Sequence, residues 1–405
     1  MNNEQIRRTH ILVECPELIA SVRVGVLNAL APLDEEMTET RFCKTRAITK
    51  SDIQWADIFV CVRGCEELSF ALAREAKRLG RLLVYFLDDD LLNLPEDTMA
   101  YRYFRDNNNQ KYLLKILENC DVLWGVNPLI RDNYYPYCKN SRWVCTRVPV
   151  VLSDLPKKSS IEHNDESINI LYAGSRDHQT IIRELIAPAV KIVLHAFPHG
   201  VSFTFVGADP GIHGDDRVKF YPFFYDYAEY RRFMECHRFS VGLAPVRTTN
   251  FYQCKYYNKF VEYTSIGATG IYTDCPLYRQ IVISGQNGVL CNNTAESWAE
   301  AIVSLIDNPE QISMYYSAAA QIIQNNFSPG GVAEQLKRQL PELVDFRAPD
   351  VKDANVFIPN PMIAFYRDRI CYLFRRYGIG AIPIIGWKII KKTVTWIARR
   401  CEHTV

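Results

Sequence analysis

The stretch that decides the fold is Val241–Leu290, VGLAPVRTTNFYQCKYYNKFVEYTSIGATGIYTDCPLYRQIVISGQNGVL. Its first apolar run ends at Pro245 and predicts a buried strand, and the polar residues after it predict a loop. A short helix carrying Lys259 and Glu262 is expected next, followed by a second β-rich run, Thr269–Thr273. This order is one strand–loop–helix–strand unit of an open α/β sheet, in which ligands bind beyond the carboxyl ends of the strands.

The charged residues of this unit indicate what such a ligand would be. Lys255, Lys259 and Glu262 are spaced by four and three residues, so a helix would place all three on one face. Cations suit a phosphate, and an ionised carboxylate, which only accepts hydrogen bonds, suits a sugar or ribose hydroxyl. The alternative is a solvated ion pair on a helix surface, worth less than about 1 kcal/mol.

The rest of the chain repeats the alternation of strands and helices, and 405 residues are too many for one ordinary core. We therefore predict an α/β fold of two Rossmann-like, doubly wound domains that face each other across a cleft. The predicted domains are residues 1–152 and 168–345, with a polar linker at 153–167 and a tail at 346–405. The predicted strands are Thr9–Val13, Asp57–Cys61, Arg81–Leu87 and Asp121–Val126, then Ile168–Ala173, Ser202–Val206, Phe239–Ala244 and Gly270–Thr273.

Two glycines follow strands of the second domain. Gly174 opens the segment Gly174-Ser175-Arg176 and would let a phosphate approach the backbone, with Ser175 and the next amides as donors at a helix N-terminus. A plain tight turn is the alternative, and His178 is either a phosphate contact or a surface polar residue. Gly207 ends the next strand.

An aromatic cluster, Phe220–Tyr225, comes later in the second domain. It is either the edge of the core or a wall for a nucleobase.

The segment from Lys255 to Gly267, followed by the strand-end Asp274, resembles the donor-binding core of the GT-B glycosyltransferases. The resemblance is strongest to the family 4-like (group 1) enzymes of bacterial surface polysaccharide synthesis, and it extends more weakly over residues 57–327. It implies a sugar donor in the second domain, with Glu262 on the ribose and with Lys259, Lys255 and the Gly174 loop on the diphosphate.

The full donor-binding set implied by the resemblance includes the Gly207 loop, which would line the base pocket. Its members are Gly174, Ser175, Arg176, His178, Gly207, Lys255, Lys259 and Glu262. One position departs from the family pattern. Many members carry a second Glu before the first in an E-x7-E motif, at the place held here by Cys254, so retention of the anomeric configuration is left open.

The first domain offers Asp88-Asp89-Asp90 directly after a strand, and Arg63 after another. Carboxylates in this arrangement hold Mg²⁺ or Mn²⁺ in the single-domain GT-A transferases, or they serve the acceptor. We expect Arg63, Asp88 and Asp90 on the acceptor side, where Arg63 would suit an anionic acceptor such as a lipid diphosphate. Asp88 or Asp89 would act as general base on the acceptor hydroxyl.

The tail is the basic part of the chain. Residues 361–405 carry nine Lys/Arg against two acidic residues, a net +7, so the first 360 residues carry 1 − 7 = −6. The apolar centre Gly378–Trp387 is too short to cross about 30 Å of hydrocarbon as a helix. Residues 361–401 are expected to lie on a membrane surface through basic and aromatic side chains, or else to pack as a helix across the two domains.

Composition limits the remaining possibilities. A formal net charge of +1 argues against nucleic acid as a partner. The thirteen cysteines are scattered without the paired spacing of a zinc site, and the N-terminus shows no signal peptide, so reduced thiols in the cytoplasm are expected.

Together these patterns predict a cytoplasmic glycosyltransferase, peripheral on the inner membrane face, that uses a nucleotide-sugar donor and a glycan or lipid-linked acceptor. No cofactor or metal is expected, and the expected catalytic residues are Lys259, Glu262, Asp88 and Asp89. The alternatives are a metal-dependent GT-A-like transferase using Asp88 and Asp90, and a degenerate GT-B scaffold that binds without turnover.

Overall fold

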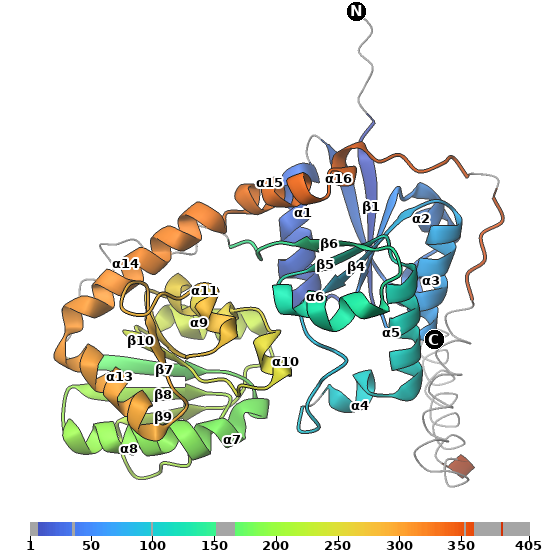
Figure 1. Cartoon of the computed structure of the whole chain (residues 1–405). Coiled ribbons are helices and arrows are strands. Elements are labelled where there is room, and N and C mark those ends of the chain that lie inside the picture. Colours follow the sequence, from blue (N-terminus) through green and yellow to red (C-terminus); the bar gives the residue numbers. More distant parts are fainter. Residues whose placement is uncertain are drawn as a thin grey trace, which may run out of the picture.

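The structure, a computed structural model, describes residues 7–34, 37–98, 100–150, 167–351, 354–359 and 382–383. Two six-stranded parallel sheets, each surrounded by helices, make up two domains that lie side by side (Figure 1). The predicted α/β class with two doubly wound sheets is confirmed. The linker 153–167 lies almost entirely outside the described residues, so its form is not described.

The first sheet has the order β2-β1-β3-β4-β5-β6. Its strands are β1 (Thr9–Cys15), β2 (Thr38–Lys44), β3 (Ile58–Val62), β4 (Leu82–Leu87), β5 (Val122–Gly125) and β6 (Arg142–Cys145). The central strands β3 and β4 are almost wholly buried because helices cover both faces, which explains their continuous apolar sequence. The helices are α1 (Asn28–Asp34), α2 (Lys50–Trp55), α3 (Glu67–Arg78), α4 (Tyr101–Phe104), α5 (Asn107–Asn119) and α6 (Pro128–Tyr134).

The second sheet has the order β12-β11-β10-β7-β8-β9. Its strands are β7 (Ile168–Ala173), β8 (Val201–Val206), β9 (Val218–Tyr221), β10 (Val241–Ala244), β11 (Thr269–Thr273) and β12 (Val289–Cys291). Its helices are α7 (Gln179–Ile181), α8 (Ala187–Ala196), α9 (Tyr227–Cys236), α10 (Asn250–Gln253), α11 (Asn258–Ser265), α12 (Pro276–Arg279), α13 (Ala295–Asp307) and α14 (Pro309–Asn326).

Each sheet has one place where successive strands depart in opposite directions. In the second sheet the chain runs from β7 to β8 and β9 on one side, then returns to place β10 on the other side of β7. In the first sheet the same reversal lies between β1 and β3. Loops diverge at such a switch point and leave a crevice beyond the strand ends, which is where α/β proteins bind ligands.

The last helices return to the first domain. Helix α15 (Pro329–Gln339) packs against α1 and β6, and α16 (Glu342–Asp345) packs against β1 (Figure 1). The side-chain amide of Gln339 exchanges hydrogen bonds of 3.0 and 2.8 Å with the backbone of Cys145, so it partly covers the edge strand β6. The predicted boundary at residue 345 assigns these helices to the second domain, whereas their contacts place them on the first.

Three strands, β2, β6 and β12, were not predicted, because they lie at sheet edges. Strand β2 has a half-exposed pattern and mixed polar sequence, β6 has four residues and β12 has three. Residues 101–119 form two helices, α4 and α5, because the Asp106 side chain accepts a hydrogen bond from the Asn108 amide and starts a new helix, α5.

The eleven cysteines in the described ranges are free thiols, and seven of them are buried. The predicted membrane-surface segment 361–401 lies outside the described residues apart from 382–383. Within the described part of the chain, no helix is both long and apolar enough to cross a membrane.

Candidate functional site

The predicted donor residues gather at the switch point of the second sheet. Strand β7 leads into Gly174 and Ser175, and strand β10 leads into the loop and helices that carry Lys255, Lys259 and Glu262. The two strands are hydrogen-bonded neighbours, so the loops that follow them share one crevice. The topology therefore brings together segments that lie about eighty residues apart in sequence.

The glycines allow the strand ends to come very close. Gly207 has a φ of 83°, and a Cβ there would lie 2.0 Å from the carbonyl oxygen of Gly174. A Cβ on Gly174 would lie 2.1 Å from the hydroxyl of Tyr172. That hydroxyl is buried and has no hydrogen-bond partner among the described residues. Both glycines are therefore required by the packing of the β7 and β8 ends.

Cations surround His178 in this crevice. The ring of His178 meets the Tyr252 ring edge-on at 5.8 Å. Burial, followed by the charges of Lys255, Lys259 and Arg247, lowers the pKa of His178 to about 3. The imidazole is therefore neutral at neutral pH and can donate one hydrogen bond and accept another. Lys255, Lys259 and Arg247 are therefore the cations whose charges act on this ring.

Glu262 lies on the same side of helix α11 as Lys259, one turn away. Its carboxylate accepts hydrogen bonds from the Lys259 ammonium and from the Tyr230 hydroxyl. About a quarter of each charged side chain is exposed, 26% for Lys259 and 24% for Glu262, so a ligand can reach both. The expected helix carrying these two residues is confirmed.

Lys255 does not share that helical face, and this expectation was wrong. Helix α11 begins only at Asn258, because α10 ends before Lys255 and the tyrosines 256 and 257 pack inward as buried residues. Lys255 lies on the turn between α10 and α11, with its ammonium 4.7 Å from the centre of the Phe251 ring. It still faces the crevice, since its charge acts on His178.

In the first domain, Arg63 is held between two of the three predicted aspartates. Its Nε donates to Asp88 at 2.5 Å and its Nη2 donates to Asp89 at 2.9 Å. Arg63 has a φ of 53°, so its backbone lies in the left-handed region at the end of β3. Burial lowers the pKa of Arg63, but Asp88 and Asp89 outweigh that effect and raise it. The guanidinium is therefore charged and already neutralised by protein carboxylates.

Asp90 behaves differently from its two neighbours. It is fully buried, and its Oδ2 accepts hydrogen bonds from Asn93 at 2.8 Å and from Asn133 at 2.7 Å. Its Oδ1 has no hydrogen-bond partner among the described residues. Asp90 therefore joins the loop after β4 to helix α6 and does not stand in the open crevice.

The two domains meet through this same loop. The Lys255 ammonium lies 3.7 Å from the Asp89 carboxylate, and Arg247 donates to Asp97 at 2.9 Å. Lys255 and Arg63 lower the pKa of Asp89 despite the opposing effect of burial. Arg247, Asp97 and Tyr230 were absent from the predicted site, because their pairing connects segments far apart in sequence. The one available signal for Arg247 was its place two residues after Pro245, shortly after strand β10.

Cys254 occupies the position where many family members carry a Glu. It is buried, with its sulfur 3.2 Å from the Asn133 side-chain nitrogen in the first domain. Burial, with the nearby carboxylates of Asp90, Asp132 and Asp89, raises the pKa of the thiol to about 12. A glutamate here would face three carboxylates, so a neutral residue fits these surroundings.

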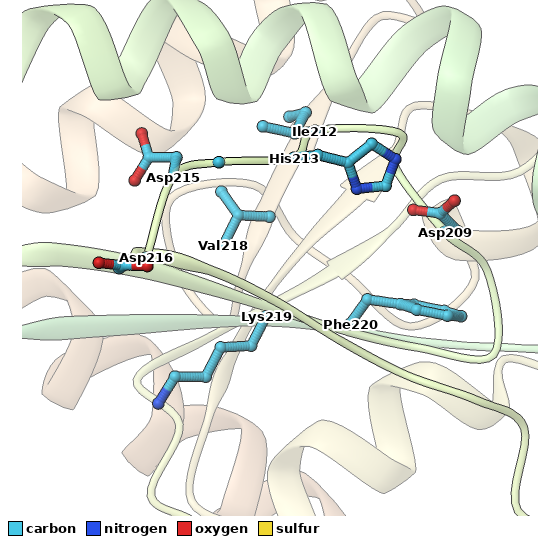
Figure 2. A pocket seen from close by; sticks show the side chains of 9 residues that line it. Asp209, Ile212, His213, Asp215, Asp216, Val218, Lys219 and Phe220 are labelled. Atoms are coloured by element: carbon cyan, nitrogen blue, oxygen red, sulfur yellow. The ribbon is translucent and has the colours of Figure 1, made fainter.

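A separate pocket of about 560 Å³ lies in the second domain, lined by Asp209, residues 212–216 and residues 218–220 (Figure 2). Its carboxylates Asp209 and Asp215 are ion-paired with Arg183 and Arg217. Across the described ranges, no three His, Cys, Asp or Glu side chains are grouped so that they could hold a metal ion. The pocket contains none of the predicted donor residues, so we place the candidate site at the switch point.

Comparison with known proteins matches part of the second domain to a family model. Residues 167–308 match the family model described as Glycosyl transferases group 1, and that span contains all the predicted donor residues. A search of curated proteins finds no match to the chain.

Similar solved structures share the two-domain architecture. HepE of Anabaena, solved in complex with UDP and glucose, has a TM-score of 0.58 at 13% identity, covering 83% of this chain and 100% of its own. Sucrose-phosphate synthase from Thermosynechococcus elongatus has a TM-score of 0.58 at 14% identity, covering 83% of this chain and 99% of its own. A glycosyltransferase from Rickettsia africae has a TM-score of 0.55 at 12% identity, covering 84% and 99%. These likenesses establish the GT-B fold, and the GT-A alternative built on Asp88 and Asp90 is therefore wrong.

Proposed function

We propose that the donor of this chain is a nucleotide-diphosphate sugar held between the β7 and β10 loops. The chain has the GT-B fold, and its residues 167–308 match the Glycosyl transferases group 1 model. UDP is the first nucleotide to consider, since HepE was solved with UDP and with UDP-glucose. The acceptor proposed is a glycan or a lipid-linked glycan bound against the first domain.

The meeting of two loops at the switch point carries this proposal, because Gly174 follows β7 and Lys255 and Lys259 follow its hydrogen-bonded neighbour β10. The charges of Lys255, Lys259 and Arg247 also act on His178. These cations provide the charge that a diphosphate requires, and Gly174, which has no side chain, is partly exposed at the end of β7. Glu262 adds an acceptor-only group beside them, which suits a ribose hydroxyl. Its present partners, Lys259 and Tyr230, would share it with the ligand.

The transfer breaks the bond between the anomeric carbon and the diphosphate oxygen and forms a bond to the acceptor oxygen. Negative charge accumulates on the leaving diphosphate, so Lys259, Lys255 and the Gly174 loop would stabilise the transition state more than the bound donor. The acceptor loses one proton from its hydroxyl, and Asp88 and Asp89 are the carboxylates proposed to orient that hydroxyl and take the proton. Arg63 would hold both carboxylates in place.

The acceptor side differs from the one expected from sequence. Arg63 is already paired with two carboxylates, so it offers no free charge to an anionic acceptor. Asp90 is buried, so it does not face an acceptor. We therefore propose that Arg63 organises the acceptor carboxylates and that Asp90 supports the loop. A location on the inner face of the membrane, through the basic segment 361–401, is proposed on the +7 charge of residues 361–405 alone.

Release of UDP from UDP-sugars, measured with purified full-length chain, tests the proposed function. Lys259→Met is expected to lower kcat by about 10²- to 10³-fold, as for other groups that stabilise developing charge. Lys191→Met, on the exposed surface of α8, is the matched control and should leave kcat unchanged. Retention of activity in EDTA would agree with a metal-independent reaction. Nucleotide binding without sugar transfer or hydrolysis would favour a scaffold that only binds.

A further inference from the structure

Asn127 joins the two domains through one buried side chain. It follows strand β5 in the first domain and is 1% exposed. Its Oδ1 accepts a hydrogen bond of 3.0 Å from the Leu129 amide and so caps helix α6. Its Nδ2 donates to the carbonyl oxygens of Gln253 and Lys255 in the second domain, at 2.8 and 2.7 Å. All the hydrogen-bonding groups of this amide side chain are therefore used.

The two carbonyl oxygens that Asn127 binds lie where helix α10 ends. The last carbonyls of a helix have no partner within the helix and need a donor from elsewhere. Here the donor comes from the other domain, and α10 stops at Gln253 with Cys254 as its C-cap. Asn133, at the far end of α6, lies 3.2 Å from the Cys254 sulfur. Residues 253–255 therefore contact both ends of α6, Asn127 at its start and Asn133 near its end.

We propose that Asn127 is a positioning residue for the donor site, acting through the backbone of Lys255. This inference rests on the proposed function, in which Lys255 binds the donor diphosphate. The Lys255 ammonium lies 3.7 Å from the Asp89 carboxylate and 4.7 Å from the centre of the Phe251 ring, and both distances depend on where the backbone of residue 255 is fixed. Lys255 thus takes its position in the donor crevice only when α6 of the first domain is docked. Donor binding and the contact between the domains are coupled through this amide.

Asn127→Asp separates positioning from helix capping. Aspartate caps a helix as well as asparagine does, so the bond from the Leu129 amide is kept. The carboxylate has no N–H group to donate and would repel the carbonyls of Gln253 and Lys255. Asn127→Ser, which also caps but is too short to reach across, is the second variant. Asp106→Asn, at the N-cap of α5 and outside the contact, is the matched control.

The measurement is titration calorimetry with UDP on the full chain. Asn127→Asp and Asn127→Ser are expected to weaken UDP binding by about tenfold, the loss of one well-placed charged contact. Lys255→Met alone should also weaken UDP binding by about tenfold. In the double variant with Asn127→Asp, it should weaken UDP binding by less than about a further threefold, because the effects of coupled residues are not additive. Asp106→Asn should bind UDP as the unchanged chain does.

The possible outcomes are distinct. Folded Asn127 variants with unchanged UDP affinity, or with losses that add fully to Lys255→Met, would overturn the inference while the proposed function stands. Failure of both Asn127 variants to fold would show that the residue is needed for folding and would overturn a role limited to positioning. Absence of UDP binding in the unchanged chain would overturn the UDP assignment and this inference with it.

Discussion

The Lys255 ammonium of the second domain lies 3.7 Å from the Asp89 carboxylate of the first. In the proposed reaction Lys255 binds the donor diphosphate, so Asp89 and the donor compete for one cation. Asp89 is also paired with Arg63, which would retain it when Lys255 moves to the donor. The contact between the domains therefore bears directly on donor affinity.

Asp89→Asn should strengthen UDP binding. The variant removes a competing charge from Lys255, and a partly exposed ion pair contributes at most about 1 kcal/mol, so a gain of up to about fivefold is expected. Calorimetry at low salt would measure it, since added salt screens the effect. Glu39→Gln, which removes a partner of Arg41 far from the crevice, is the control. Weaker UDP binding in Asp89→Asn would contradict the claim that Asp89 and the donor compete for Lys255.

Cys254→Glu should not restore a missing function but should destabilise the protein. The new carboxylate would be buried beside Asp90, Asp132 and Asp89, and burying an unpaired charge costs several kcal/mol. Chemical denaturation should show a loss of about 3 kcal/mol, against less than about 2 kcal/mol for Cys254→Ala. Increased sugar transfer in a stable Cys254→Glu variant would show that the reasoning about this position is wrong.

Much of this site could be predicted from local sequence, and the rest depends on contacts between distant segments. The apolar runs of β7 and β10, the glycines after β7 and β8, and the Lys259–Glu262 spacing are local patterns that the structure retains. The place of Lys255 outside α11 was not predictable, because the buried tyrosines before Asn258 are set by packing against distant residues. Asn127 carried only the signal of a helix cap, Asn before Pro, and its bonds to the other domain required the fold.

His178 should make the protein less stable in acid. Its pKa is lowered to about 3 in the folded chain, whereas an unfolded histidine has a pKa of about 6.5. Between these values the unfolded chain binds more protons, so the free energy of unfolding falls as pH decreases from about 6.5. Urea unfolding at pH 7 and pH 5 measures how far the free energy of unfolding falls between these pH values. The fall should be smaller for His178→Asn than for the unchanged chain. Equal decreases would mean that His178 is protonated in the folded state.

Gly207→Ala should be strongly destabilising. The residue has a φ of 83°, and the added Cβ would lie 2.0 Å from the Gly174 carbonyl oxygen, so the backbone must shift. A loss of more than about 1 kcal/mol in the free energy of unfolding is expected. Gly330→Ala, where no atom lies within 4 Å of the added Cβ in helix α15, should be neutral or stabilising. Similar effects at both positions would contradict the close approach of the β7 and β8 ends.

The central claim is that a nucleoside diphosphate binds between the β7 and β10 loops and is held by Glu262 and its neighbours. Its most direct test is calorimetric titration of UDP, GDP and ADP into the unchanged chain and into Glu262→Gln. The account predicts that one diphosphate binds and that Glu262→Gln weakens it by about tenfold or more, the loss of a charged hydrogen bond to the ribose. Binding of that diphosphate with equal affinity to both proteins, or no binding of any of the three, would contradict it.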